Sequence, residues 1–116
     1  MLGAVLLALA TIIGALGAHT LKTRLSIDRY EVLQTAVHYQ FFHALGLLGL
    51  GLLAERQPSP WLAVSGWLVL SGVTLFCGSL YLLLAGGPLL LGVLTPIGGV
   101  ALIAGWCVCA LALMRP

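Results

Sequence analysis

Three long runs without a charged side chain occupy most of this chain, at residues 2–21, 32–54 and 57–114. A helix that crosses the hydrocarbon core of a bilayer needs about 20 consecutive apolar residues. The first two runs are each long enough for one crossing. The third is long enough for two, with the turn-forming sequence "AGGP" near its middle. The runs therefore predict four transmembrane helices, near residues 2–20, 27–54, 60–85 and 89–114.

The composition requires lipid as the solvent. Hydrophobic residues make up 61% of the chain and charged residues only 7%, whereas a soluble domain carries about 25% charged residues. Runs such as "VLLALATIIGALGA" lack the alternation of a membrane β-barrel. We therefore predict an all-α fold, an integral membrane four-helix bundle that forms a single transmembrane domain over residues 1–116.

The amino-terminal run resembles a secretory signal in its length and its small residues. No Lys or Arg precedes the apolar stretch, however, so the basic region of a signal peptide is weak. We interpret this segment as the first transmembrane helix.

The second helix is expected to begin at the membrane interface. Ser26 is a suitable N-cap, and Asp28 lies in the first turn, where a carboxylate favours the helix dipole. Two stripes follow helical spacing, an apolar one of Tyr30, Leu33, Val37 and Phe41 and a polar one of Glu31, Gln34, Thr35 and His38. This pattern predicts an amphipathic, interfacial start to the second helix.

A kink or break is expected near Thr95-Pro96. This pair matches an N-cap followed by proline at the first helical position, and Gly98 and Gly99 lower the local helix propensity. We expect residues 94–99 to have the most irregular backbone of the chain. Because irregular backbone in lipid must be buried in protein or line a wet cavity, this segment is predicted to face the bundle interior near helices one and two.

The histidines do not have the spacing of a metal site. His38 and His43 are five residues apart, about 140° around a helix, so they cannot bind one metal from one helix face. A site would need His19 or another chain, and we predict no catalytic residue, no cofactor and no metal. We expect His43 to be buried and to donate a hydrogen bond to a facing helix, at a free carbonyl or Tyr81. An intramembrane histidine is also a functional candidate by default.

Four segments in order along the chain carry a family resemblance. They are "GALGAH" (14–19), "TAVHYQFFHALGLL" (35–48), "LFCGSLYLLLAGG" (75–87) and "LTPIGGVALIAGW" (94–106). They resemble the domain-of-unknown-function 423 family, small membrane proteins that are YgdD-like in bacteria and similar to transmembrane protein 256 in animals. The resemblance implies a four-helix protein of the bacterial inner membrane and supplies no established activity.

Two sets of positions are candidates for function. The candidate polar cluster consists of His19, His38, Tyr39, His43, Ser79, Tyr81 and Thr95. The candidate helix-packing or irregular-backbone positions are Gly14, Gly17, Gly78, Pro96, Gly98, Gly99 and Gly105.

Three functional hypotheses follow from these residues. The first is a non-enzymatic membrane protein that contacts lipid, or an accessory subunit that packs against other membrane proteins or against itself as a homo-oligomer. The second is a proton or small-solute transporter or channel, a homo-oligomer acting through its intramembrane histidines, although the uncharged runs contain no Asp or Glu of the kind proton carriers use. The third, an enzyme acting on a lipid or quinone, lacks a recognisable motif. A net charge of +2 argues against nucleic acid as a partner.

The basic residues favour one orientation. Loop 21–31 carries Lys22, Arg24 and Arg29, whereas the opposite side carries Arg56 and Arg115. Because Lys and Arg accumulate in cytoplasmic loops, we predict that loop 21–31 is cytoplasmic and that both termini lie outside.

Overall fold

The computed structural model describes residues 1–114, which are almost entirely helical. The elements are α1 (Leu2–Leu16), the π-helical η1 (Gly17–Leu21), α2 (Lys22–Arg24), α3 (Ile27–Arg56), α4 (Pro60–Leu84), the 3₁₀-helical η2 (Leu89–Val93) and α5 (Leu94–Met114). Four stretches are long and apolar enough to cross a membrane, namely Leu2–Arg24, Ile27–Arg56, Pro60–Leu84 and Leu89–Met114. The predicted all-α membrane fold is therefore confirmed, with the first helix extended to Arg24 through η1.

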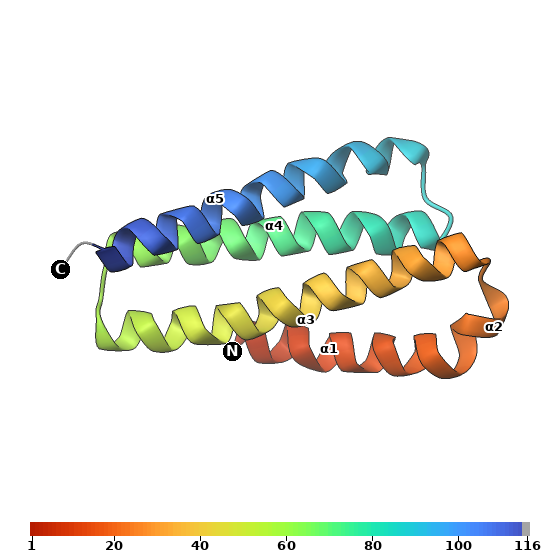
Figure 1. Cartoon of the computed structure of the whole chain (residues 1–116), viewed down its shortest axis with the longest axis horizontal. Coiled ribbons are helices and arrows are strands. Elements are labelled where there is room, and N and C mark those ends of the chain that lie inside the picture. The colour runs from red at the N-terminus through yellow and green to blue at the C-terminus, as the bar shows by residue number, and fades with distance from the viewer. Residues whose placement is uncertain (115–116) are drawn as a thin grey trace.

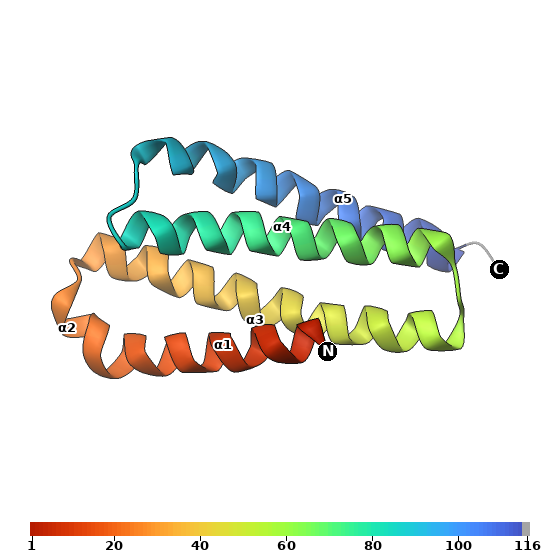
Figure 2. The same ribbon diagram turned by 180° about the vertical axis from the view of Figure 1, so that it is seen from behind.

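Each long helix packs mainly against its neighbours in the sequence. α1 packs on α3, α3 on α4 and α4 on α5, so that α1 and α5 lie at opposite edges of the molecule (Figure 1). The view from behind shows the same order (Figure 2). The protein is thus an open bundle of 51 × 27 × 17 Å.

The tightest packing joins α4 to α5, because small residues let the two backbones approach. A Cβ added to Gly98 would lie 2.5 Å from the backbone nitrogen of Phe76, and one added to Gly105 would lie 2.7 Å from a methyl group of Val69. Close approach through small residues is how helices associate in lipid, where packing rather than hydrophobicity drives contact. The space around the Cβ position of Gly78, by contrast, is open.

The prediction of irregular backbone over residues 94–99 was wrong. This segment is regular α-helix from Leu94 onward, so Thr95 lies inside the helix rather than at its N-cap. Pro96 falls in the first turn, where backbone N–H groups have no intrahelical partner and proline is tolerated. The predicted break is present just before it, as the change from 3₁₀-helix η2 to α5, and further irregular backbone occurs in η1.

The same segment also faces a different helix from the one predicted. Gly98 packs against Gly72 and Phe76 of α4, and the Thr95 hydroxyl lies 2.6 Å from that of Ser79, also in α4. The close approach of α4 and α5 therefore places residues 94–99 against α4 rather than beside helices one and two.

The start of α3 has the predicted amphipathic character. The Ser26 hydroxyl accepts a hydrogen bond from the Arg29 backbone nitrogen at 3.3 Å, which confirms the N-cap. Leu33 and Val37 are buried, whereas His38 and its polar neighbours Glu31 and Thr35 are exposed. With 30 residues, α3 is about 45 Å long. The hydrocarbon core is only about 30 Å thick, so either this polar first section lies in the interface or α3 tilts strongly.

Candidate functional site

One amide side chain joins three helices inside the bundle. Gln40 of α3 is only 3% exposed. Its Nε2 donates to the carbonyl oxygen of Leu6 in α1 at 2.8 Å, and its Oε1 accepts from the hydroxyl of Tyr81 in α4 at 2.7 Å. In lipid an unpaired polar group costs several kcal/mol. These contacts therefore favour one register of α1, α3 and α4.

His43 is held by an aromatic partner from α5. The Trp106 Nε1–H donates to His43 Nδ1 at 3.0 Å, which leaves the proton of a neutral imidazole on Nε2. The predicted hydrogen bond to a facing helix is present, but His43 accepts it rather than donating to a carbonyl or to Tyr81. The physical reason is that indole N–H is only a donor, while Tyr81 is engaged by Gln40. His43 is half-buried rather than buried.

Two hydroxyl contacts hold α4 to α5. Ser65 donates to the carbonyl oxygen of Gly105 at 2.8 Å, and the hydroxyls of Ser79 and Thr95 form a second bond. Within residues 1–114, no fully buried side-chain nitrogen or oxygen is left without a partner. The buried polar groups of the described chain are therefore paired with one another.

The remaining members of the candidate polar cluster lie in separate environments. His19 is exposed on η1, and His38 is exposed on the first half of α3. The Tyr39 ring stacks on Phe76 with ring centroids 4.3 Å apart, and it lies 5.8 Å from the His43 ring. Within residues 1–114, no group of three His, Cys, Asp or Glu side chains is placed to hold a metal ion.

Gln40 was not among the residues predicted from the sequence, although its position in the helical pattern indicates a buried polar group. It follows Leu33 and Val37 and precedes Ala44 at helical spacing, on the face of α3 that is buried. A polar residue within such an apolar stripe is expected to find a partner on a facing helix. The polar stripe that ends at His38 lies instead on the exposed face of α3.

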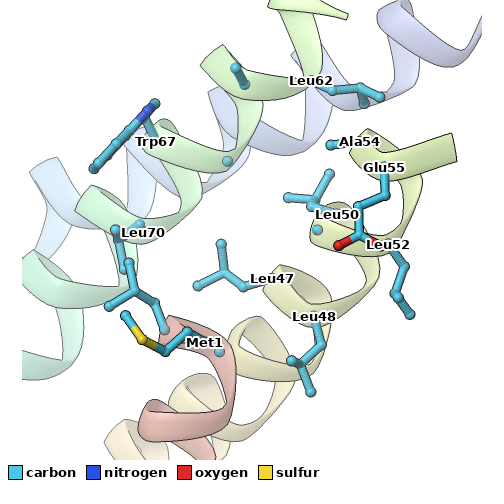
Figure 3. Close-up of a pocket in the computed structure, with 15 residues that line it drawn as sticks. Met1, Leu47, Leu48, Leu50, Leu52, Ala54, Glu55, Leu62, Trp67 and Leu70 are labelled. Atoms are coloured by element: carbon cyan, nitrogen blue, oxygen red, sulfur yellow. The ribbon is translucent and has the colours of Figure 1, made fainter. Parts of the chain in front are cut away.

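An apolar groove opens where α1 begins part-way along α3 (Figure 3). Gly3 lies against Ala44 and Leu48, so the last turns of α3 extend beyond the start of α1 (Figure 1). The groove has a volume of about 630 Å³ and lies between the start of α1, the second half of α3 and the first half of α4. Leucine is the commonest residue in its walls, with Trp67 on α4, and Glu55 is the one ionisable side chain in its lining.

A polar cleft of about 700 Å³ lies at the other end of α3. The polar side chains in its wall are Lys22, Tyr30, Glu31, Gln34, Thr35 and His38. A slot of about 170 Å³ lies between α1 and α3, and its apolar wall consists of Ile13, Gly14, Gly17, Leu33, Val37 and Phe41. Gln34 and His38 line both hollows. The cleft and the slot are therefore neighbouring hollows that share these two polar residues.

A family model described as a protein of unknown function, DUF423, matches residues 13–99. The match covers most of the chain and includes the polar cleft, the slot and Gln40. The chain belongs to the DUF423 family. The resemblance found in the sequence motifs is thereby confirmed.

The relatives of this DUF423 protein are named as membrane proteins. The UPF0382 membrane protein YwdK of Bacillus subtilis is 38% identical over 99% of this chain and 94% of its own length. A UPF0382 membrane protein of Staphylococcus epidermidis is 40% identical over 99% and 93%. The UPF0382 inner membrane protein YgdD of Escherichia coli is 37% identical over 89% and 79%. No solved structure matches the DUF423 chain.

Proposed function

We propose that this DUF423 protein is a non-enzymatic membrane protein that contacts lipid through the hollows between its helices. The observation that carries the proposal is the contrast between its interior and its groove. The buried Gln40 and the half-buried Tyr81 are paired with one another, whereas the groove beside Trp67 is mostly apolar and open at the side.

An acyl chain is the occupant that fits the groove. Water fills a cavity only where it finds two to four polar partners, and Glu55 is the one charged side chain among the largely apolar residues of the groove. The groove lies along α3 and α4, which are long and apolar enough to span the bilayer. Lipid chains therefore surround it and can enter from the side.

The alternative of histidine-based transport by a homo-oligomer receives no support from the arrangement of the histidines within one chain. His43 is bonded to Trp106, and His19 and His38 are exposed at other places on the molecule. A proton path would need these groups, or water between them, to lie in one continuous polar channel.

Glycine substitutions test the groove with matched controls. Gly51 and Gly66 line it, while Gly49 and Gly78 do not; at all four, an added Cβ would meet no atom within 4 Å. We expect Gly51→Leu and Gly66→Leu to fill the groove and to lower the lipid retained by the purified protein in native mass spectrometry. Gly49→Leu and Gly78→Leu should retain as much lipid as the wild type.

Two results would contradict the proposal. One is equal lipid retention by all four variants, and the other is a wild-type protein that retains no lipid at all. A membrane protein that co-purifies at fixed stoichiometry and shields cysteines placed at 51 and 66 from labelling would identify a protein, not lipid, as the occupant.

A further inference from the structure

The π-helical segment η1 determines where the single lysine of the chain points. The backbone N–H of Lys22 bonds to the carbonyl oxygen of Gly17, five residues earlier, whereas an α-helix bonds residues four apart. Gly17 is buried and faces α3, since its Cβ would lie 3.0 Å from the Leu33 side chain. Lys22 therefore lies one π-turn beyond Gly17, on the side of the helix that faces α3.

Without the extra residue of the π-turn, Lys22 would be rotated by about 100° around the helix axis. With it, Lys22 lines the same cleft as Glu31, Gln34 and His38 of α3. π-turns often occur at functional sites. Here a cation and a carboxylate, Lys22 and Glu31, line one hollow.

The cleft adjoins a smaller hollow whose walls are mostly apolar. Gln34 and His38 also line the slot between α1 and α3, whose other walls include Leu33, Val37 and Phe41. Gly14 leaves ordinary van der Waals room there, because its Cβ would be 3.5 Å from Val37. A molecule that fits both hollows must have a charged head and an apolar tail.

We propose that the cleft binds the headgroup of a phospholipid that carries both a phosphate and a primary ammonium, with one acyl chain entering the slot. Lys22 contacts the phosphate, and the Glu31 carboxylate accepts hydrogen bonds from the ammonium. This inference rests on the proposed function as a lipid-contacting protein and adds the class of lipid and a second place of contact.

The charges of the cleft select this headgroup over others. A purely anionic headgroup would leave Glu31 without a favourable partner, and like charges repel. A quaternary ammonium has no N–H to donate to Glu31 or to the oxygen of Gln34, whose amide nitrogen is already bonded to the Tyr30 hydroxyl at 2.6 Å. A phosphoethanolamine headgroup satisfies the cation and the carboxylate together.

The test compares lipids that share acyl chains and differ in headgroup. The full-length protein in detergent is offered phosphatidylethanolamine, phosphatidylcholine, phosphatidylglycerol or diacylglycerol, and native mass spectrometry measures the bound fraction. Lys22→Gln and Glu31→Gln remove the two charges. Arg24→Gln is the matched control, since Arg24 is exposed two residues from Lys22 and does not line the cleft. Lys22→Arg retains the charge.

We expect the wild type, Arg24→Gln and Lys22→Arg to prefer phosphatidylethanolamine over the other lipids. Lys22→Gln and Glu31→Gln should each lower its binding about fivefold, the factor expected for one charge contact at a headgroup. Each variant is expected to fold, because all of these side chains are exposed. Thermal melting of each variant checks this.

The failures of the two proposals are distinguishable. If the wild type binds diacylglycerol as well as phosphatidylethanolamine, or if Lys22→Gln and Arg24→Gln behave alike, the headgroup site is refuted while lipid contact stands. If the wild type binds none of the four lipids, the proposed function fails as well.

Discussion

At the scale of single residues, the decisive groups are polar side chains that pair across helices in an apolar solvent. Gln40 satisfies the Tyr81 hydroxyl and donates to α1, while Trp106 satisfies one nitrogen of His43. Each pairing removes a polar group from contact with lipid. Because such bonds have few alternatives in hydrocarbon, they bring specific helix faces together.

Replacing Gln40 by leucine tests this role. We expect Gln40→Leu to lower the free energy of unfolding in mixed micelles by about 1–2 kcal/mol, since two interhelical hydrogen bonds are lost and Tyr81 is left unpaired. Gln34→Leu is the control, because Gln34 bonds only within its own helix, to Tyr30. In a double-mutant cycle, Tyr81→Phe should cost less in the Gln40→Leu background than in the wild type. Equal stability of the Gln40 and Gln34 variants would show that the buried amide contributes nothing.

At the scale of helices, glycine positions determine how closely two elements approach. Gly98 lies against the backbone of α4, whereas the Cβ position of its neighbour Gly99 meets only the Phe76 ring at 3.9 Å. The two glycines are adjacent in sequence and alike in propensity. Only their packing against α4 distinguishes them.

Alanine at these two positions should therefore affect the free energy of unfolding differently. Gly98→Ala would place a methyl group 2.5 Å from the Phe76 nitrogen, and forcing the helices apart is expected to cost about 1–3 kcal/mol. Gly99→Ala should be neutral or stabilise by up to about 1 kcal/mol through helix propensity. Thermal unfolding in detergent measures both, and a Gly98→Ala protein as stable as Gly99→Ala would contradict the packing of α5 on α4.

At the scale of the whole molecule, the polar cleft and the apolar groove lie at opposite ends of α3. The cleft is beside loop 21–31, and the groove is beside the turn from α3 to α4. If loop 21–31 is cytoplasmic, as its basic residues favour, the cleft faces the inner leaflet and the groove the outer one. Orientation in the membrane therefore decides which leaflet supplies each lipid.

Reporter fusions check this orientation. We predict that a reporter joined after Pro116 is active only if it functions outside the cytoplasm, and that one inserted in loop 21–31 is active in the cytoplasm. The physical reason is the excess of Lys22, Arg24 and Arg29 over the basic residues on the other side. A cytoplasmic signal from the Pro116 fusion would reverse the assignment of leaflets.

The sequence alone determined the class of the protein and the number of its helices. In lipid every backbone polar group must be satisfied internally, by a helix or a closed barrel, and long uncharged runs without alternation permit only the helix. The N-cap at Ser26 and the exposed polar stripe through His38 were also readable, since both depend on residues close together in the chain. Helix periodicity also indicates that Gln40 lies on the buried face of α3, a prediction that was not made.

Only the tertiary structure decided which helix each polar or small residue meets. The local sequence does not indicate that Gln40 bonds to Leu6 and Tyr81, that His43 accepts from Trp106, or that Gly98 packs on α4. The π-turn before Lys22, which lines the same cleft as Glu31, was likewise not predicted. It lies where Gly17 packs against Leu33 of α3. Contacts between elements distant in sequence form where shapes and hydrogen-bond partners match, and the helical period alone does not contain that information.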